Sequence, residues 1–491
     1  MMSTDVNVVP HRVFRKYFGV RSLQAIYQSK VKGTRLKGVD RIDSSGFSRK
    51  RQNGKSRERE EIRIISRKAL DSTYMFSPYL ELLKGKGRDK NPRVLAIPTI
   101  RDRIALHALK EVLFEIFPEC VNRRFANTVI RDINQACMQL NKSQLGFFRT
   151  DISNFYGSID RGELLSLIGK KVRSKKVKTM LRRAMTRPIV PKIYSKRQLA
   201  QYEVSGIPQG LSISNILAEI YMYELDGKMK NDPQVLFYSR YVDDILVISN
   251  MNHLPNVVSR LRAELEPNDA LGLKLNESKT YTNSAHLTEF NLSNTFEYLG
   301  YQFSDNMVPS PKRSSEEKLI RSVTGLFCEY KSALRVIKKS RKKVENKRFE
   351  SECLRKTFMF RLNEKITGAL SEKKKYGWMF YFIEIGDRSS LYRIDAIFSR
   401  MLTKTEGLDS NVPPILKKLA RTYFEAIHSP ERGYIHNYNR YNSSEKRRDF
   451  LIEHGYIDAR KSITLKKSDR KFYAIRNYNL SKLLQDETFL Y

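Results

Sequence analysis

Cysteine, long apolar runs and acidic residues are all scarce in this chain of 491 residues. The four cysteines, Cys120, Cys137, Cys328 and Cys353, include no CxxC pair, which argues against a disulfide scaffold and against a structural zinc site. No apolar run approaches the ~18–20 residues of a membrane span. The segment 1–18 lacks the apolar core of a signal peptide. We therefore expect a soluble, cytoplasmic protein with no membrane partner.

The shortage of acidic residues leaves a large positive charge. The sequence has 91 Lys and Arg residues against 53 Asp and Glu residues, a formal net charge of +38. Basic side chains that neutralise phosphates release counterions and thereby gain affinity for nucleic acid. Solubility alone is the weaker explanation, because so large an excess repels itself within a folded chain. We expect a nucleic-acid partner, while charge alone does not distinguish RNA from DNA or a binder from an enzyme.

Composition divides the chain into four segments. Residues 1–60 are basic and polar, and they predict an N-terminal extension that is flexible or partly helical, with a solvated arm as the alternative. In residues 61–303, helical apolar patterns alternate with short β-rich runs, which predicts an α+β fold and not a doubly wound sheet. Within the third segment, residues 310–410, the stretch 315–405 is typical of basic helices without strands. Residues 411–491 are rich in Tyr, Arg and Lys.

The strongest local pattern is Tyr241-Val-Asp-Asp244, which lies between the β-rich runs LFYSR and ILVIS. This arrangement predicts a hairpin with Asp243 and Asp244 at its tip. Adjacent carboxylates repel each other and are tolerated best when they are exposed or neutralised by cations. On its own, the segment would be interpreted as an ordinary acidic turn.

A second β-rich run, FFRTDI, brings a third carboxylate, Asp151, close to its end. Three aspartates at the ends of neighbouring strands can hold two Mg²⁺ ions, which prefer oxygen ligands and complete their shells with phosphates and water; Mn²⁺ is the alternative ion. Two ions ~4 Å apart activate an attacking hydroxyl and stabilise a departing pyrophosphate. Such chemistry requires positioned charge and no protein nucleophile.

The loop Gly206-Ile-Pro-Gln-Gly210 precedes a helical pattern, SNILAEIYMYELD. Its two glycines allow the backbone to approach a nucleotide or a template base closely. Loops of Gly and Pro before helices are common, so this motif is weak evidence by itself. Its position between Asp151 and Asp243 gives it value.

Taken in order, these motifs resemble those of reverse transcriptases, from residue 93 to residue 303. The segments 271–280 (LGLKLNESKT) and 296–300 (FEYLG) resemble the family's GLxLNxxKT segment and primer-grip hairpin. Upstream, 93–98 (RVLAIP) resembles the fingers motif of group II intron and retron enzymes. The resemblance implies a right-hand polymerase, with fingers and palm in 61–303, a helical thumb in 310–410 and an α-helical C-terminal extension in 411–491.

The resemblance also implies catalytic roles. Asp151, Asp243 and Asp244 would bind the metal ions together with the carbonyl of Ile152. Lys279 would protonate the leaving pyrophosphate, although a lysine in so basic a chain is by default a surface residue.

Further positions would contact the nucleotide, the template or the primer. Arg93 would contact the triphosphate, a role suited to a guanidinium fork, with Lys86 and Lys90 as weaker alternatives. Tyr156 would be the steric gate that clashes with a ribose 2′-OH, or else a simple core aromatic. Gln209 would lie against the incoming nucleotide or the template. The template and primer would be contacted by Gly206, Gly210, Tyr241, Leu299 and Gly300.

Subfamily assignment depends mainly on what is missing. The endonuclease tail with Cys and His clusters, usual in group II intron proteins, is not visible, and residues 133–137 lack the histidine of the retron NAxxH element. What remains resembles the bacterial defence-associated and abortive-infection reverse transcriptases. This resemblance implies a non-coding RNA template, dNTPs as substrates, a DNA product and a role in anti-phage defence.

Several alternatives stay open at this point. They are a retron-type enzyme that makes branched RNA–DNA, a template-independent DNA polymerase, and a catalytically inactive scaffold that only binds RNA. Priming from a protein hydroxyl, with Tyr491 as the sharpest position, is a further alternative to an RNA or DNA primer. Assembly into a homo-oligomer is also left open.

Overall fold

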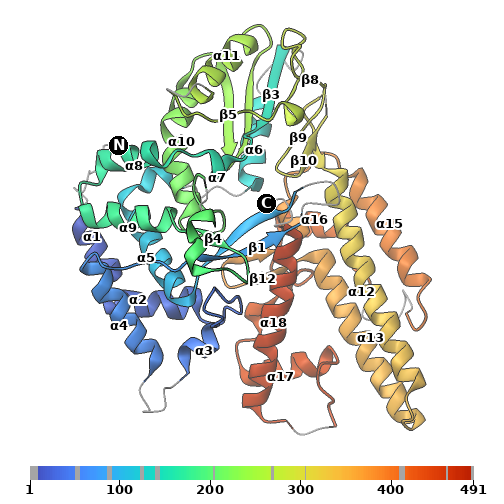
Figure 1. Ribbon diagram of the computed structural model, residues 1–491. Helices are drawn as coiled ribbons and strands as arrows, with labels where there is room; N and C mark the ends of the chain where they lie inside the picture. Colours follow the sequence, from blue (N-terminus) through green and yellow to red (C-terminus); the bar gives the residue numbers. More distant parts are fainter. Residues whose placement is uncertain are drawn as a thin grey trace. The chain divides into compact units, whose positions relative to one another are not determined.

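The computed structural model describes most of the chain as two compact units. It describes residues 9–49, 56–85, 91–121, 126–138, 144–202, 205–266, 270–304, 306–408, 415–460 and 463–487. The first unit comprises Met1–Arg123 and Gln144–Leu292, and the second comprises Arg124–Ser143 and Ser293–Tyr491 (Figure 1). Lys86, Lys90, Tyr491 and the boundary expected at 410 lie outside the described residues. The four-part division expected from composition stays a prediction.

A five-stranded sheet organises the first unit, with the strand order β5-β6-β3-β7-β8. Its strands are β3 (Leu145–Asp151), β5 (Val235–Tyr241), β6 (Asp244–Asn250), β7 (Tyr281–Thr282) and β8 (Asn291–Leu292). The three longest strands are antiparallel neighbours and correspond to the β-rich runs found in the sequence. Together with the helices around it, this sheet confirms the expected α+β class.

Helices of the first unit pack against this sheet and around a second, smaller one. Helix α10 (Ser214–Asn231) and helix α11 (Leu254–Leu265) lie against the sheet. The smaller sheet has the order β2-β1-β4 and is formed by β1 (Tyr79–Lys84), β2 (Arg93–Ile97) and β4 (Ile189–Val190). The remaining long helices are α4 (Arg57–Leu70), α5 (Ile100–Ile116), α8 (Arg161–Lys171) and α9 (Lys175–Met185).

Helix α5 shows why the sequence forms the core where it does. Thr99 caps its first turn by accepting a hydrogen bond from the backbone N–H of Asp102, which satisfies one of the donors that a helix start leaves open. Ile104, Leu106 and Leu109 are fully buried. Apolar residues around the whole helix, and not along one stripe, are typical of a helix at the centre of a core.

The N-terminal residues also belong to this core. The chain forms α1 (Pro10–Phe18), α2 (Val20–Ile26), a short π-helix (Tyr27–Val31) and α3 (Ser44–Ser48). Phe14, Phe18 and Leu23 are buried in the same apolar cluster as α5. For residues 10–31 the solvated-arm interpretation is therefore wrong. That interpretation gave too much weight to the basic residues and too little to the apolar residues, which recur at helical spacing.

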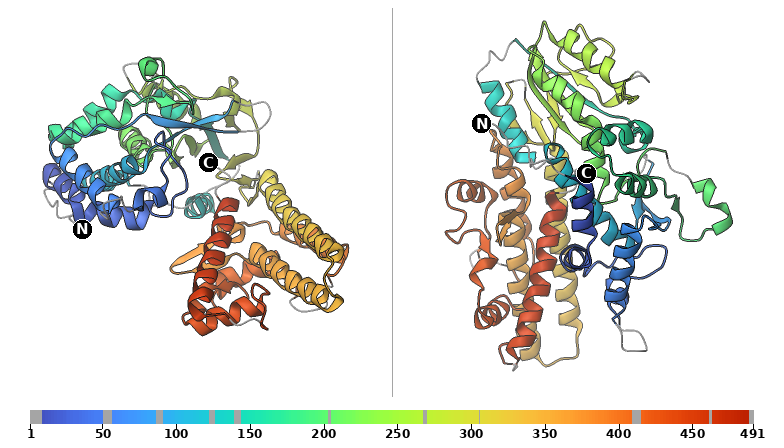
Figure 2. Two further views of the ribbon diagram at one scale, coloured as in Figure 1. Left: turned by 60° about the horizontal axis from the view of Figure 1, so that its bottom comes forward. Right: turned by 90° about the vertical axis from the view of Figure 1, so that its left-hand side faces the viewer.

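The second unit is mainly helical. It contains α6 (Ala126–Met138), α12 (Arg313–Lys339), α13 (Val344–Thr367), α14 (Trp378–Tyr381), α15 (Ser389–Thr403), α16 (Leu419–His428), α17 (Ser444–Glu453) and α18 (Leu465–Glu487). Figure 2 shows the long helices α12 and α13 running side by side. The expected helical C-terminal region is thus confirmed.

Two small sheets accompany these helices. One has the order β11-β10-β9, formed by β9 (Phe296–Tyr298), β10 (Tyr301–Phe303) and β11 (Pro309–Pro311). The other has the order β13-β12-β14, formed by β12 (Ala369–Ser371), β13 (Lys374–Tyr376) and β14 (His436–Asn437). The expectation that residues 315–405 contain no strand is therefore wrong. Strands of three residues leave too little alternation in the sequence to be recognised.

Two expectations about the whole chain can be compared with the structure. All four cysteines are free. Within the described ranges, no helix combines the length and the apolar character that crossing a membrane would require.

Candidate active site

The three predicted catalytic aspartates meet at one end of the five-stranded sheet. Strand β3 ends at Asp151 and strand β6 begins at Asp244, and the antiparallel register places these two residues directly opposite each other. The backbone N–H of Ile152 donates to the carbonyl of Asp243 over 2.9 Å. Residues from two distant stretches of sequence are thus joined by backbone pairing, independently of how their side chains are turned.

The Tyr241–Asp244 hairpin has a tight tip. Tyr241 pairs with Asp244 in the β5–β6 register, so Val242 and Asp243 form the turn. Val242 has φ +62°, a left-handed conformation that β-branched residues rarely adopt. Such a backbone conformation costs of order 1–3 kcal/mol and persists where the surrounding structure enforces it.

Arg240 supports this tip and was not identified from the sequence. Its guanidinium donates to the carbonyl of Val242 over 2.9 Å and forms ion pairs with Glu219 at 2.6 Å and Asp226 at 2.7 Å. The hydroxyl of Tyr238 also donates to Asp226, over 2.8 Å. The Arg240 side chain is 1% exposed. The sequence contained one signal for this role: Arg240 is a charged residue within a β-rich run of a buried sheet. Such a residue is rarely buried unless it is paired.

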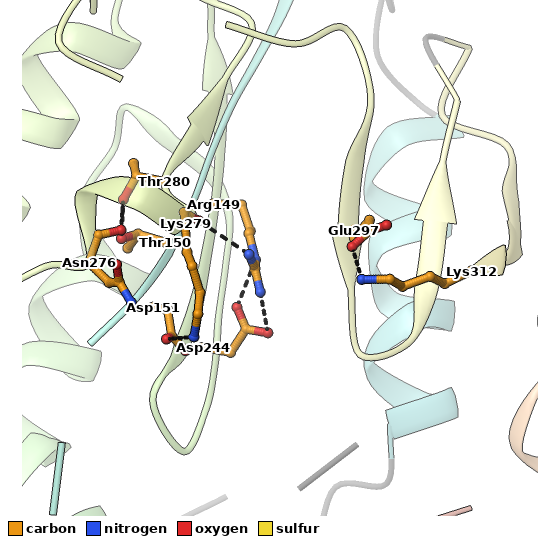
Figure 3. A network of polar contacts seen from close by, with 9 residues as sticks. All are labelled: Arg149, Thr150, Asp151, Asp244, Asn276, Lys279, Thr280, Glu297 and Lys312. Carbon is orange, nitrogen blue, oxygen red and sulfur yellow. Dashed lines mark hydrogen bonds and ion pairs between the residues drawn. The ribbon is translucent and has the colours of Figure 1, made fainter. Parts of the chain in front are cut away.

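Two basic side chains neutralise the carboxylates (Figure 3). Arg149 donates to both oxygens of Asp244, over 3.0 Å and 3.2 Å, and Lys279 forms an ion pair with Asp151. Arg149 was not predicted. It lies two residues before Asp151 on β3, and therefore on the same face of the strand.

The segment that carries Lys279 is fixed beside β3. The backbone N–H of Asn276 donates to the carbonyl of Asp151 over 2.7 Å, and the hydroxyls of Thr150 and Thr280 lie 2.7 Å apart (Figure 3). The structure therefore brings Lys279 to Asp151, and its role as a proton donor stays a prediction.

The carboxyl groups of Asp243 and Asp244 hold their protons more tightly than usual. Burial raises the pKa of Asp244 to about 7, against the opposing effect of Arg149, and the charges of Asp151 and Asp243 raise it further. Burial also raises the pKa of Asp243, followed by the charge of Asp151. Burial, with a smaller contribution from the neighbouring carboxylates, therefore outweighs the effect of the basic side chains on the pKa of Asp243 and Asp244.

A metal ion would provide the missing compensation. Among the described residues, no group of three His, Cys, Asp or Glu side chains is arranged to hold a metal ion, since Asp151 and Asp244 face Lys279 and Arg149. The donor chemistry nevertheless suits a divalent ion, because it consists of clustered carboxylates whose repulsion a cation would relieve. These residues fit such an ion if the two basic side chains release the carboxylates.

Arg93 and Tyr156 lie within electrostatic reach of this cluster. Tyr156 belongs to the short helix α7 (Phe155–Ser158), and burial raises its pKa to about 12, with a further contribution from the charge of Asp243. Arg93, at the start of β2, lowers the pKa of both Tyr156 and Asp243 by its positive charge. Three of the predicted site residues are thus brought together from separate elements.

The loop Gly206–Gly210, the glycine-rich loop, is held between α7 and β2. A Cβ on Gly206, whose φ is +64°, would overlap the carbonyl oxygen of Tyr156, and the N–H of Ile207 donates to that same oxygen over 2.8 Å. At the other end of the loop, the carbonyl of Gln209 accepts from the N–H of Ala96 over 2.7 Å, and Gly210 has φ +99°. Close backbone approach explains why glycine occupies the first of these positions.

Leu299 and Gly300 belong to the second unit. They form the turn between β9 and β10, with φ of +49° and +80°. The Tyr381 hydroxyl donates to the Leu299 carbonyl over 2.9 Å, and the N–H of Lys312 donates to the Gly300 carbonyl over 2.9 Å. Figure 3 also draws the ion pair between Lys312 and Glu297. The template and primer roles of these turn residues stay predictions.

Comparisons with known proteins identify the central part of the chain. Residues 84–303 match the family model described as reverse transcriptase (RNA-dependent DNA polymerase). The chain is 28% identical over 220 residues to the group II intron-encoded protein LtrA of Lactococcus lactis subsp. cremoris, covering 43% of this chain and 34% of that protein. It is 25% identical over 166 residues to an uncharacterized 91 kDa protein in the cob intron of Schizosaccharomyces pombe, covering 32% and 19%.

A solved structure of apo telomerase from Candida tropicalis is also similar, at 13% identity and a TM-score of 0.39 over 84% of this chain and 68% of that one. At that TM-score the likeness adds nothing to the sheet topology described above. The chain spans about a third of the length of LtrA. The segment that matches the reverse transcriptase family model, residues 84–303, contains the three aspartates, Arg93, Tyr156 and the glycine-rich loop.

Proposed function

We propose that the protein is an RNA-directed DNA polymerase that extends a DNA strand with dNTPs. The observation that carries this proposal is the pairing of Asp151 with Asp244 in one sheet register, next to Asp243, within a reverse transcriptase domain. An RNA-binding scaffold would not require three carboxylates together in a chain of net charge +38, because they would repel the bound polyanion.

The proposed mechanism assigns one task to each residue. Asp151, Asp243 and Asp244, with the carbonyl of Ile152, would hold two divalent ions, and we expect Mg²⁺, with Mn²⁺ as a substitute. When bound, such ions activate the attacking 3′-hydroxyl and stabilise charge on the departing pyrophosphate. Lys279, released from Asp151, would deliver a proton to the pyrophosphate.

Nucleotide selection falls to the residues around this cluster. The guanidinium of Arg93 would bind the triphosphate of the incoming nucleotide. Tyr156 is half-buried, and its backbone carbonyl accepts a hydrogen bond from the N–H of Ile207. Its ring would exclude a 2′-hydroxyl and so favour dNTPs. Gln209 would lie against the incoming nucleotide or the template. Template or primer would be contacted by Gly206, Gly210, Tyr241, Leu299 and Gly300.

The biological setting is the less direct part of the proposal. We propose that a non-coding RNA provides the template, that the enzyme acts in the cytoplasm, and that its DNA product functions in anti-phage defence. The positive charge supports an RNA partner. The defence role depends on the resemblance drawn from the sequence.

The experiment that tests this proposal is to purify the protein with its bound nucleic acid, supply labelled dNTPs, and sequence both the RNA and the DNA. We expect DNA complementary to one co-purified RNA. DNA joined to an RNA 2′-position would indicate a retron-type enzyme, and DNA without a template would indicate untemplated synthesis. Bound RNA with no DNA synthesis under any divalent ion would leave only the scaffold function.

A further inference from the structure

The second unit contains a polar cavity of about 130 Å³ between α12, α13 and α18. Each helix contributes residues at helical spacing, so one face of each helix lines the cavity, and these faces include Gly325 from α12, Arg361, Glu364 and Lys365 from α13, and Asn479 and Lys482 from α18. Nothing in the proposed polymerase chemistry uses these residues.

Part of the cavity wall, which also includes Leu326 and Leu483, is made of buried polar side chains. Glu364 is 4% exposed, Asn479 is 5% exposed and Lys365 is 8% exposed. The hydroxyl of Tyr438 donates to Glu364 over 2.6 Å, and the amide of Asn479 donates to that hydroxyl over 3.3 Å. Burying such groups is costly compared with burying apolar side chains. Their positions are fixed, as the wall of a binding site requires.

The charges around the cavity favour an anion. Arg361, Lys365 and Lys482 face two carboxyl groups, and one of these, Glu329, forms an ion pair with Arg361 at 2.9 Å. Burial raises the pKa of the other, Glu364, to about 7, so a substantial fraction of it is uncharged at neutral pH. The lining therefore has a positive balance and many hydrogen-bond donors, which suits a ligand that offers several acceptor oxygens.

Gly325 keeps the rim of the cavity open. It is an exposed residue in the middle of α12, and a Cβ built on it would meet no atom within 4 Å. Glycine at an exposed position inside a helix costs about 0.8–1.0 kcal/mol relative to alanine. A larger side chain would favour the helix and would add atoms at the edge of the cavity, which Gly325 lines, so the helix alone does not account for glycine here.

The volume limits what can enter. An apolar cavity of ~150 Å³ is large enough to bind benzene, so about 130 Å³ accommodates one compact group and not a whole nucleotide. We propose that this cavity binds the phosphate group of a phosphate monoester, held by Arg361, Lys365 and Lys482, with the rest of the ligand outside. The monoester is either the 5′-phosphate of a free nucleotide or the 5′-phosphate end of a nucleic acid.

The test measures binding by the full-length protein, without any polymerase reaction. Titration calorimetry is carried out with inorganic phosphate, with dAMP against deoxyadenosine, and with a 5′-phosphorylated against a 5′-hydroxyl oligoribonucleotide. The variant Gly325→Phe covers the rim, and Gly227→Phe is its matched control, because Gly227 is also inside a helix with open space around it. Lys482→Gln removes one exposed charge with little risk to folding.

We expect Gly325→Phe and Lys482→Gln each to weaken phosphate binding at least tenfold, while Gly227→Phe binds as the wild type does. Preference for dAMP over deoxyadenosine identifies the free nucleotide as the source, and preference for the phosphorylated oligonucleotide identifies the nucleic-acid end. Equal phosphate affinity in all four proteins would overturn the proposal. So would failure of the wild-type protein to bind any of the three phosphate probes.

Discussion

Arg240 donates a hydrogen bond to the backbone carbonyl of Val242, over 2.9 Å, from a side chain that is almost completely buried. Val242 is the residue with positive φ in the turn between Tyr241 and Asp243. The same guanidinium is paired with Glu219 and Asp226. Glu219 and Asp226 lie on α10. Arg240 therefore connects α10 to the hairpin tip that carries two of the three carboxylates, and we assign it a positioning role.

Replacing Arg240 by Met should weaken both the fold and the site. Two carboxylates would be left buried without their partner, a change that typically costs about 3–5 kcal/mol of unfolding free energy, measured by chemical denaturation. The double variant R240M/E219Q should recover part of that loss. If the hairpin tip depends on Arg240, dNTP incorporation by the double variant stays below the wild-type rate even where its stability is recovered. Full activity in the double variant would contradict the positioning role.

Tyr156→Val should admit ribonucleotides. Removal of the ring opens the space that a 2′-hydroxyl would occupy, so the ratio of kcat/KM for dNTP over NTP should fall at least tenfold, or by about 1.4 kcal/mol. Tyr156→Phe is the matched control, because it keeps the ring and removes only the hydroxyl. Discrimination that is unchanged in the valine variant would show that Tyr156 is a core aromatic and not the gate.

Lys279→Met should slow the chemical step. Loss of a positioned proton donor typically lowers the rate by ~10²–10⁴-fold, so single-turnover incorporation should fall within that range while the KM for dNTP changes little. Lys228→Met, which breaks an exposed ion pair with Glu264, controls for loss of a surface charge. A Lys279 variant with wild-type rates would exclude the lysine as the acid.

The carboxyl of Glu364 gives a pH-dependent stability that can be isolated by mutation. Burial raises its pKa in the folded state to about 7 from its ordinary value of 4.5, so the folded protein binds this proton more tightly than the unfolded chain does. The resulting stabilisation is complete below about pH 4.5 and is lost as the pH rises towards 7, and it amounts to about 3 kcal/mol. The free energies of unfolding of wild type and Glu364→Gln should therefore diverge over this range, with the variant gaining relative to wild type. Parallel curves would contradict the raised pKa.

Local sequence patterns predicted much of the first unit. The runs that became β3, β5 and β6, and the helical pattern SNILAEIYMYELD that became α10, were recognisable because each carries its own periodicity. The three aspartates could be grouped because a known order of motifs links them. These features depend on residues close together in the chain or on a family pattern.

Contacts between distant residues were not predictable in the same way. Nothing near Arg149 in the sequence indicates that it pairs with Asp244, and nothing near Arg240 indicates Glu219 as its partner. Both basic residues lie in β-rich runs, where an alternating pattern fixes the face of a side chain but not its partner. The ion pairs that Asp151 and Asp244 form with basic side chains also arise only from the folded geometry.

The most direct test of the polymerase assignment is templated dNTP incorporation by Asp243→Asn and Asp244→Asn, with and without Mg²⁺. Each substitution keeps the size of the side chain and removes the charge that a divalent ion needs. Wild type should incorporate dNTPs only when a divalent ion is present, and each variant should lose at least about 10³-fold of that rate, or about 4 kcal/mol, while still binding RNA. Incorporation at the wild-type rate by either variant, or by the wild type in EDTA, would contradict the account.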